Sequence, residues 1–106
     1  MNGNKNDSED YFVEAPPHPG EILKHDFLVP LELTQTELAD RLDIPYPRVN
    51  EIVNGKRGVT PETAVLLEKL FDVSAEFWLN LQRTYDLYEA KQGEAGKKSD
   101  NIEPIT

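Results

Sequence analysis

Several side chains between residues 35 and 57 have the chemistry to contact nucleic acid. Asn50 offers an amide donor and an amide acceptor, the pair of groups that binds adenine in the major groove. Gln35 suits a phosphate beside a helix N-terminus, where free backbone amides favour the same anion. Lys56 and Arg57 are cations that suit backbone phosphates. The candidate residues for contact with DNA are Gln35, Tyr46, Pro47, Arg48, Asn50, Glu51, Asn54, Lys56 and Arg57.

Each candidate also has a simpler interpretation as an exposed polar group of a helical protein. For Arg48 two interpretations are equally good: contact with DNA, or an ion pair with Glu51 or another neighbouring acid. Tyr46 suits a thymine methyl group or the sugar-phosphate backbone. The residue types alone therefore leave the individual roles open.

Other kinds of chemistry lack a supporting pattern. The only histidines, His18 and His25, are not accompanied by further ligands at metal-site spacing, and cysteine is absent. The carboxylates include no evident pair in an apolar pocket, and no nucleophile motif accompanies them. The sequence therefore predicts that the chain is not an enzyme and has no catalytic residues, no cofactor and no metal.

The candidate contacts belong to a pattern that positions two short helices at a steep angle. Over residues 35–54, the small residue Ala39 falls where the helices must cross, and Asp43 supplies a turn residue that tolerates positive φ. The turn and the second helix have apolar anchors at Ile44, Val49 and Ile52. Two amphipathic helices with a short turn can imitate this pattern, but here five constrained positions agree. The outer positions of the second helix are then free to face DNA.

The rest of the chain is predicted to be helical, with proline and capping residues marking the helix ends. Pro19 suits a first helical turn, Thr34 and Glu37 form a capping box, and Thr60-Pro61 begins another helix. No convincing strand and no internal repeat is evident. The predicted fold class is a compact, all-α, five-helix domain, with helices at about 19–29, 35–42, 46–54, 61–71 and 75–90.

This domain is predicted to cover residues 18–91. Residues 1–17 read as a flexible arm and residues 92–106 as a disordered tail, because both are polar and poor in apolar residues. Residues 11–13, Tyr-Phe-Val, form an apolar island in the arm that either docks loosely on the domain or orders on contact with a partner. No segment is long and apolar enough to span a membrane, and no signal peptide is evident, so a cytoplasmic protein is expected.

The net charge of −9 opposes non-specific binding to DNA, but it is unevenly distributed. Residues 34–60 carry four basic and four acidic groups and are neutral, whereas residues 1–33 carry −5 and residues 61–90 carry −4. The segment predicted to face DNA is therefore less acidic than its surroundings. The acidic remainder suits a basic protein partner.

Residues 35–54 resemble the helix-turn-helix of lambda-repressor-like proteins, with two departures. Members of that family often have glycine in the turn, where this chain has Asp43, and a hydroxyl residue at the start of the recognition helix, where this chain has Pro45 and then Pro47. The two prolines remove backbone amides that otherwise suit phosphate.

A longer resemblance, over about residues 18–90, is to the HigA antitoxins, also called VapI-type antidote proteins. It rests on three blocks in family order: His-Pro-Gly-Glu-Ile-Leu at 18–23, Asn-Gly-Lys-Arg-Gly at 54–58 followed by Thr60-Pro61, and Glu-Phe-Trp-Leu-Asn-Leu-Gln at 76–82. The resemblance implies a five-helix, DNA-binding dimer that neutralises a HigB-type messenger RNA endonuclease and represses its own operon. Its expected partners are double-stranded operator DNA, the HigB-type toxin and a second copy of the chain.

An apolar stripe near the end of the domain is expected to serve partly as core and partly as a dimer interface, with Trp78, Leu81 and Tyr85 as the candidate interface residues. Trp78, Leu81 and Tyr85 recur at helical spacing, and the stripe is longer than so small a domain needs for its own core. Two alternatives to the antitoxin remain: a stand-alone repressor of the same fold, and a protein-interaction module that has lost DNA binding. The acidic charge and the two prolines favour the second alternative slightly.

Overall fold

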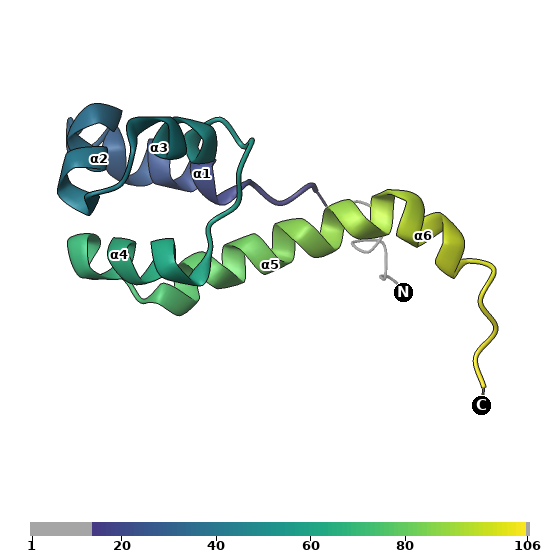
Figure 1. Ribbon diagram of the computed structural model, residues 1–106. Helices are drawn as coiled ribbons and strands as arrows, with labels where there is room; N and C mark the ends of the chain where they lie inside the picture. The colour runs from purple at the N-terminus through teal and green to yellow at the C-terminus, as the bar shows by residue number, and fades with distance from the viewer. Residues whose placement is uncertain (1–13, 106) are drawn as a thin grey trace, which may run out of the picture.

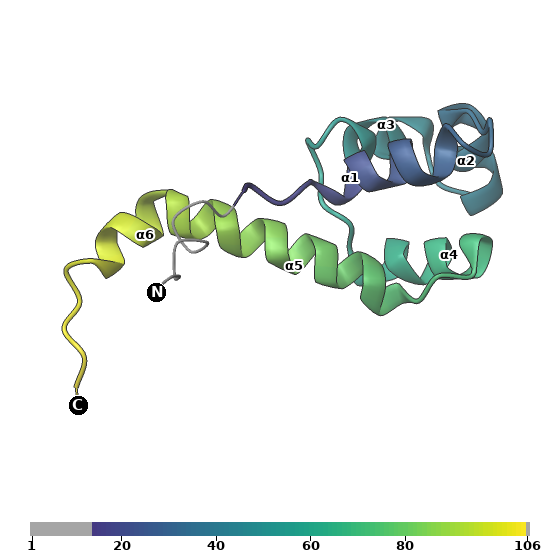
Figure 2. The same cartoon turned by 180° about the vertical axis from the view of Figure 1, so that it is seen from behind.

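The computed structural model describes residues 14–105 and confirms the predicted all-α fold, since this part of the chain contains helices and turns but no strand (Figure 1). The helices α1, α2 and α3 form one layer, and α4 packs with α5 beneath them (Figures 1 and 2). Along the chain the elements are α1 (Pro19–Ile22), η2 (Leu23–Leu28), α2 (Gln35–Leu42), α3 (Tyr46–Val53), α4 (Pro61–Phe71), α5 (Ala75–Gln92) and α6 (Glu94–Ser99).

The first predicted helix is present but changes its winding after one turn. From Leu23 to Leu28 it is a π-helix, η2, whose last turn is closed by a 2.9 Å bond from the Val29 amide to the Lys24 carbonyl. A π-turn bonds residues five apart, so it brings Leu23 and Leu28 to the same side, where both are buried. The helix gives way to a turn at Val29 and Pro30, near the predicted end.

His18 caps the start of α1 and ties it to α5. Its Nδ1 accepts a 2.9 Å hydrogen bond from the Gly20 amide, and its ring packs edge to face against Tyr85 with centroids 4.9 Å apart. Burial lowers the pKa of His18, and the nearby carboxylates of Glu21 and Asp86 oppose this shift only in part. The imidazole therefore favours its neutral form in the fold, which also keeps Nδ1 available as an acceptor.

The backbones of α1 and α3 touch at Gly20. A Cβ added there would lie 1.8 Å from the carbonyl oxygen of Ile52, much closer than atoms can approach. Only glycine leaves room for this contact, which fixes the buried side of α3 against α1. The Pro-Gly pair at the start of the first helix is therefore a packing requirement as well as a helix start.

The predicted capping box begins α2. The Thr34 hydroxyl accepts from the Glu37 amide at 3.0 Å, and the Glu37 carboxylate accepts from the Thr34 amide at 2.8 Å. Hydrogen bonds from the backbone amide and the side chain of Thr34 to the Glu37 carboxylate lower the pKa of Glu37. The helix ends at Asp43, whose φ of 57° confirms the predicted left-handed turn residue.

Trp78 belongs to the core and is fully buried within its own protomer. Its indole ring is tilted against Phe27 and meets Phe77 edge to face, with both pairs of centroids 5.1 Å apart. The prediction that Trp78 contributes to a dimer surface is therefore corrected, because its side chain is used up in joining η2 to α5. The other buried apolar residues are Leu23, Leu28, Leu38, Ala39, Leu42, Val49, Ile52, Val53, Val59, Ala64 and Leu67.

The C-terminal region differs from the predicted disordered tail. After a break at Gly93, residues 94–99 form the short helix α6, which continues beyond the end of α5 (Figure 1). Glu94 lies in its first turn, and Lys97 and Lys98 lie in its last turn. Each of these charges interacts favourably with the helix dipole and so stabilises the helix. None of its residues is buried, and the backbone of Gly96 lies close against the Lys91 carbonyl of α5. Of the predicted arm, residues 1–13, including Tyr11-Phe12-Val13, lie outside the described residues, and residues 14–17 are without regular structure.

Gly20→Ala is expected to destabilise the fold by about 3 kcal/mol or more, because its methyl group overlaps the Ile52 carbonyl and forces α1 away from α3. Urea unfolding followed by circular dichroism measures the change. Glu21→Ala, at an exposed position in the same turn, is the matched control and should cost under about 1 kcal/mol. Equal stability of the two variants contradicts the close contact.

The His18 environment predicts a pH dependence of stability. Because the folded pKa of His18 is lowered, the unfolded chain takes up the proton more readily, so this contribution is complete above the ordinary pKa of about 6.5 and is lost as pH falls through the folded pKa. The thermal midpoint should fall between pH 7.5 and 5.5. His18→Asn keeps a capping group without a titrating ring, so the thermal midpoint of this variant should depend less on pH. His25 is present in both proteins and therefore cannot cause the difference. Parallel profiles would show that His18 is not the cause.

Candidate nucleic-acid interface

The helices α2 and α3 cross around Ala39 and are joined by a tight turn. Ala39 is buried at the crossing, and its carbonyl accepts from the Ile44 amide at 3.1 Å. The inner side of α3 is anchored by Val49, Ile52 and Val53, all buried. Because the inner side is apolar and fixed, the opposite side of α3 is held outward on a rigid support.

Asn50 is the centre of a hydrogen-bonded cluster on the outer side of α3. Its Nδ2 donates to Gln35 Oε1 at 3.0 Å and to the Tyr46 hydroxyl at 3.4 Å. Its Oδ1 accepts from Asn54 Nδ2 at 3.2 Å. We call Gln35, Tyr46, Asn50 and Asn54 the amide cluster. Four of the sequence-predicted site residues are thus brought together, and they come from both helices of the motif.

The bonding within the amide cluster restricts how it can meet a ligand. The side-chain carbonyl of Gln35 accepts from Asn50, and this bond fixes the orientation of the Gln35 carboxamide. The Nε2 group of Gln35 is then oriented as a donor. Asn50 has both a donor and an acceptor, the set required by an adenine edge, and engaging both means exchanging its weaker bonds to Tyr46 and Asn54. The cluster therefore arranges hydrogen-bonding groups in advance on the outer side of α3.

The loop after α3 carries the two predicted phosphate-contacting cations. The Lys56 and Arg57 amides both donate to the Glu51 carbonyl, at 2.8 and 3.2 Å. The Arg57 Nε also pairs with Glu51 Oε1 at 2.7 Å, with both side chains about half exposed. An exposed pair of this kind contributes at most about 1 kcal/mol of stability, so its main effect is to orient Arg57. Glu51, one of the partners that the sequence offers Arg48, is therefore engaged by Arg57 instead.

The two prolines change what the start of α3 can offer. Pro45 is the N-cap residue and makes no side-chain capping bond, and Pro47 occupies the first turn without an amide hydrogen. Pro47 is exposed and Arg48 is half-buried beside it. With few backbone donors at this end, contact with an anion must come from side chains and from the start of α2.

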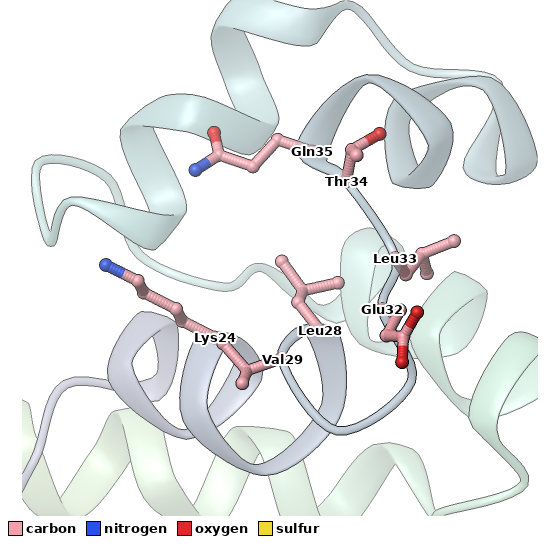
Figure 3. Close-up of a pocket in the computed structure, with 7 residues that line it drawn as sticks. All are labelled: Lys24, Leu28, Val29, Glu32, Leu33, Thr34 and Gln35. Atoms are coloured by element: carbon pink, nitrogen blue, oxygen red, sulfur yellow. The ribbon is translucent and has the colours of Figure 1, made fainter.

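An open depression lies between η2 and the start of α2, with Lys24 and Gln35 at one end and Glu32 at the other (Figure 3). Nothing in the sequence spacing relates Lys24 to the motif, and only the fold brings it beside Gln35. Lys24 adds a cation to this side of the domain. The depression is lined by Lys24, Leu28, Val29, Glu32, Leu33, Thr34 and Gln35.

Gln82 is a second residue that the sequence analysis did not single out, although it closes the third block of the family resemblance. Its side chain reaches from α5 to the loop after α3.

Within the described residues, no three His, Asp or Glu side chains converge in a way that could hold a metal ion, and no helix is long and apolar enough to cross a membrane.

The crossing of α2 and α3, with a polar outer side on α3 and an apolar inner side, defines a helix-turn-helix protein. A helix-turn-helix family model matches residues 26–78. The chain is 51% identical over 76 residues to virulence-associated protein A of Dichelobacter nodosus, an alignment that covers 71% of this chain and 74% of that protein.

Solved structures give the same relationship. The antitoxin HigA of Pseudomonas aeruginosa, in a structure with the higBA promoter, has a TM-score of 0.82 at 40% identity and covers 86% of this chain and 99% of its own. An addiction module antidote protein of the HigA family from Coxiella burnetii has a TM-score of 0.79 at 39% identity and covers 87% and 100%. The chain belongs to the lambda-repressor-like helix-turn-helix proteins of HigA type.

Asn50→Ala and Lys56→Ala should affect binding to duplex DNA differently. Removing the Asn50 amide should relax base preference at one position, by about 1–3 kcal/mol if the contact is bidentate. Removing the Lys56 charge should weaken all duplexes alike and reduce the dependence of log affinity on log salt by about 1. Titration of promoter and single-base variants at several salt concentrations separates the two effects, and a uniform loss for Asn50→Ala contradicts its assignment to a base.

Proposed function

We propose that this chain is a DNA-binding antitoxin of a HigBA-type module, which neutralises a messenger RNA endonuclease and represses the operon that encodes both. The observation that carries the proposal is the amide cluster on the outer side of α3, in a chain 40% identical to a HigA antitoxin whose structure includes its promoter. In this proposal α3 lies in the major groove and the start of α2 faces the backbone.

The charge distribution supports selective rather than non-specific binding. The proposed interface has few cations, and the chain as a whole is at −9. Phosphate contacts supply most of the non-specific affinity, so a weak set of them makes base contacts by the amide cluster more decisive. Two copies reading an inverted repeat, with recognition helices about 34 Å apart, would supply the affinity that one short helix lacks.

The long helix α5 supports self-association. It projects beyond the layer of α1 to α3 (Figures 1 and 2). Leu87, in the second half of α5, is 51% exposed. Of the predicted interface residues, Leu81 and Tyr85 are half-buried, and Tyr85 already packs on His18. A dimer surface on α5 would therefore use Leu87 and the accessible parts of Leu81 and Tyr85, without Trp78.

The acidic regions outside the DNA-facing segment support a basic protein partner. An endonuclease that binds RNA needs a basic active surface, and opposite charge speeds encounter between such proteins. Residues 1–33 carry −5 and residues 61–90 carry −4, and in this proposal residues 1–33 supply much of the toxin contact. The N-terminal arm adds the apolar residues Tyr11, Phe12 and Val13 as an anchor.

Removal of residues 1–15 should separate the two activities. The full chain should bind its own promoter in preference to random duplex at moderate salt, and should copurify with the product of the neighbouring gene. The truncated chain should keep the promoter preference and bind the toxin less tightly, with a weaker dependence on salt because acidic groups have been lost. Gel shifts and titration calorimetry at two salt concentrations measure both.

The outcomes distinguish the proposal from its rivals. A chain with promoter preference but no copurifying toxin is a stand-alone repressor. A chain that binds the toxin but prefers no duplex is a protein-interaction module. Unchanged toxin affinity after truncation places the toxin contact on the helical body and contradicts the role given to the arm.

A further inference from the structure

The loop between α3 and α4 is held by one polar side chain from α5. The Val59 amide donates to Gln82 Oε1 at 2.8 Å, joining residues 23 positions apart. Val59 itself is buried in the core. The bond therefore fixes the backbone two residues after Arg57.

Gln82 is itself oriented by its neighbours. Its Nε2 donates to Asp86 Oδ1 at 2.9 Å, one turn further along α5, so the carboxamide presents its oxygen to the loop. Gly58 provides the space for this approach, since an added Cβ would lie 3.0 Å from the atoms of the Gln82 carboxamide. The close packing of loop backbone on a specifically oriented amide distinguishes this contact from a chance surface bond.

The other end of the loop is held by α3. The Glu51 carbonyl accepts from the amides of Lys56 and Arg57, and the Glu51 carboxylate pairs with the Arg57 side chain. The two cations therefore lie between an anchor on α3 and an anchor on α5. A loop restrained at both ends loses less conformational freedom when it binds.

We propose that Gln82 is a positioning residue of the DNA interface, which holds the 56–59 loop so that Lys56 and Arg57 are presented to phosphate beside α3. This inference rests on the proposed DNA binding. Gln82 does not touch DNA, and its contribution passes through the backbone of the loop. In this proposal α5, the helix proposed for self-association, also supports the loop whose cations, Lys56 and Arg57, contact the phosphates of DNA.

The contact is tested without DNA by hydrogen exchange of the Val59 amide in the full chain. Gln82→Met keeps the side-chain length but loses the acceptor, and should make exchange of this amide about tenfold faster while the Leu67 amide in the core is unchanged. Gln82→Glu keeps an acceptor and should restore protection of Val59, despite its repulsion from Asp86. Unchanged exchange in Gln82→Met overturns the proposal, and faster exchange at Val59 and Leu67 alike would mean general destabilisation instead.

The role in binding is tested by combining variants. Gln82→Met should lower promoter affinity about fivefold, the effect of one lost hydrogen bond, and should lower the salt dependence. In a Lys56→Ala/Arg57→Ala background it should have no further effect, because the side chains that Gln82 positions are gone. An equal loss in both backgrounds contradicts the positioning role. A wild-type chain that prefers no duplex contradicts the proposed function, while Val59 exchange still decides whether Gln82 holds the loop.

Discussion

The contact between the backbones of α1 and α3 at Gly20 is the constraint on which the rest of the structure depends. With no Cβ in the way, the Ile52 carbonyl approaches the first turn of α1, and this fixes the inner side of α3. Since one side is fixed, the amide cluster must face outward. His18, two residues earlier, caps the same turn. Its ring packs on Tyr85 of α5 and lies beside Gly55, in the loop after α3. One short segment therefore sets the position of the recognition helix relative to α5.

Features that depend on neighbours in sequence could be predicted, and features that depend on distant residues could not. The Thr34 capping box and the left-handed turn at Asp43 follow from local bonding, and both were predicted and are present. The contact between Gln35 and Asn50 joins residues 15 positions apart, and the contact between Val59 and Gln82 joins residues still further apart, so neither leaves a local signal. Trp78 was misplaced for a related reason: periodicity shows that a residue lies on an apolar stripe, but it does not show whether the core or a partner covers it.

The proposed interface combines a prearranged polar surface with weak electrostatics. The loop that carries Lys56 and Arg57 is held from α3 by Glu51 and from α5 by the bond between the Val59 amide and Gln82, while the prolines at 45 and 47 remove backbone donors from the start of α3. A protein with few phosphate contacts has little affinity for DNA of arbitrary sequence, so its selectivity must come from the geometry of its side chains. Rigid support of those side chains by α1, α2 and α5 is consistent with that requirement.

The central claim is that the outer side of α3, with the start of α2 and the loop that follows α3, forms one surface for DNA. The most direct measurement is the change in backbone and side-chain amide NMR signals when the isotope-labelled full chain is titrated with a duplex from its own promoter. The account predicts that the largest changes fall on Gln35, Asn50, Asn54, Lys56 and Arg57, with a random duplex giving smaller changes. Changes concentrated on α5 and α6, with the side-chain amides of Gln35 and Asn50 unaffected, would contradict it.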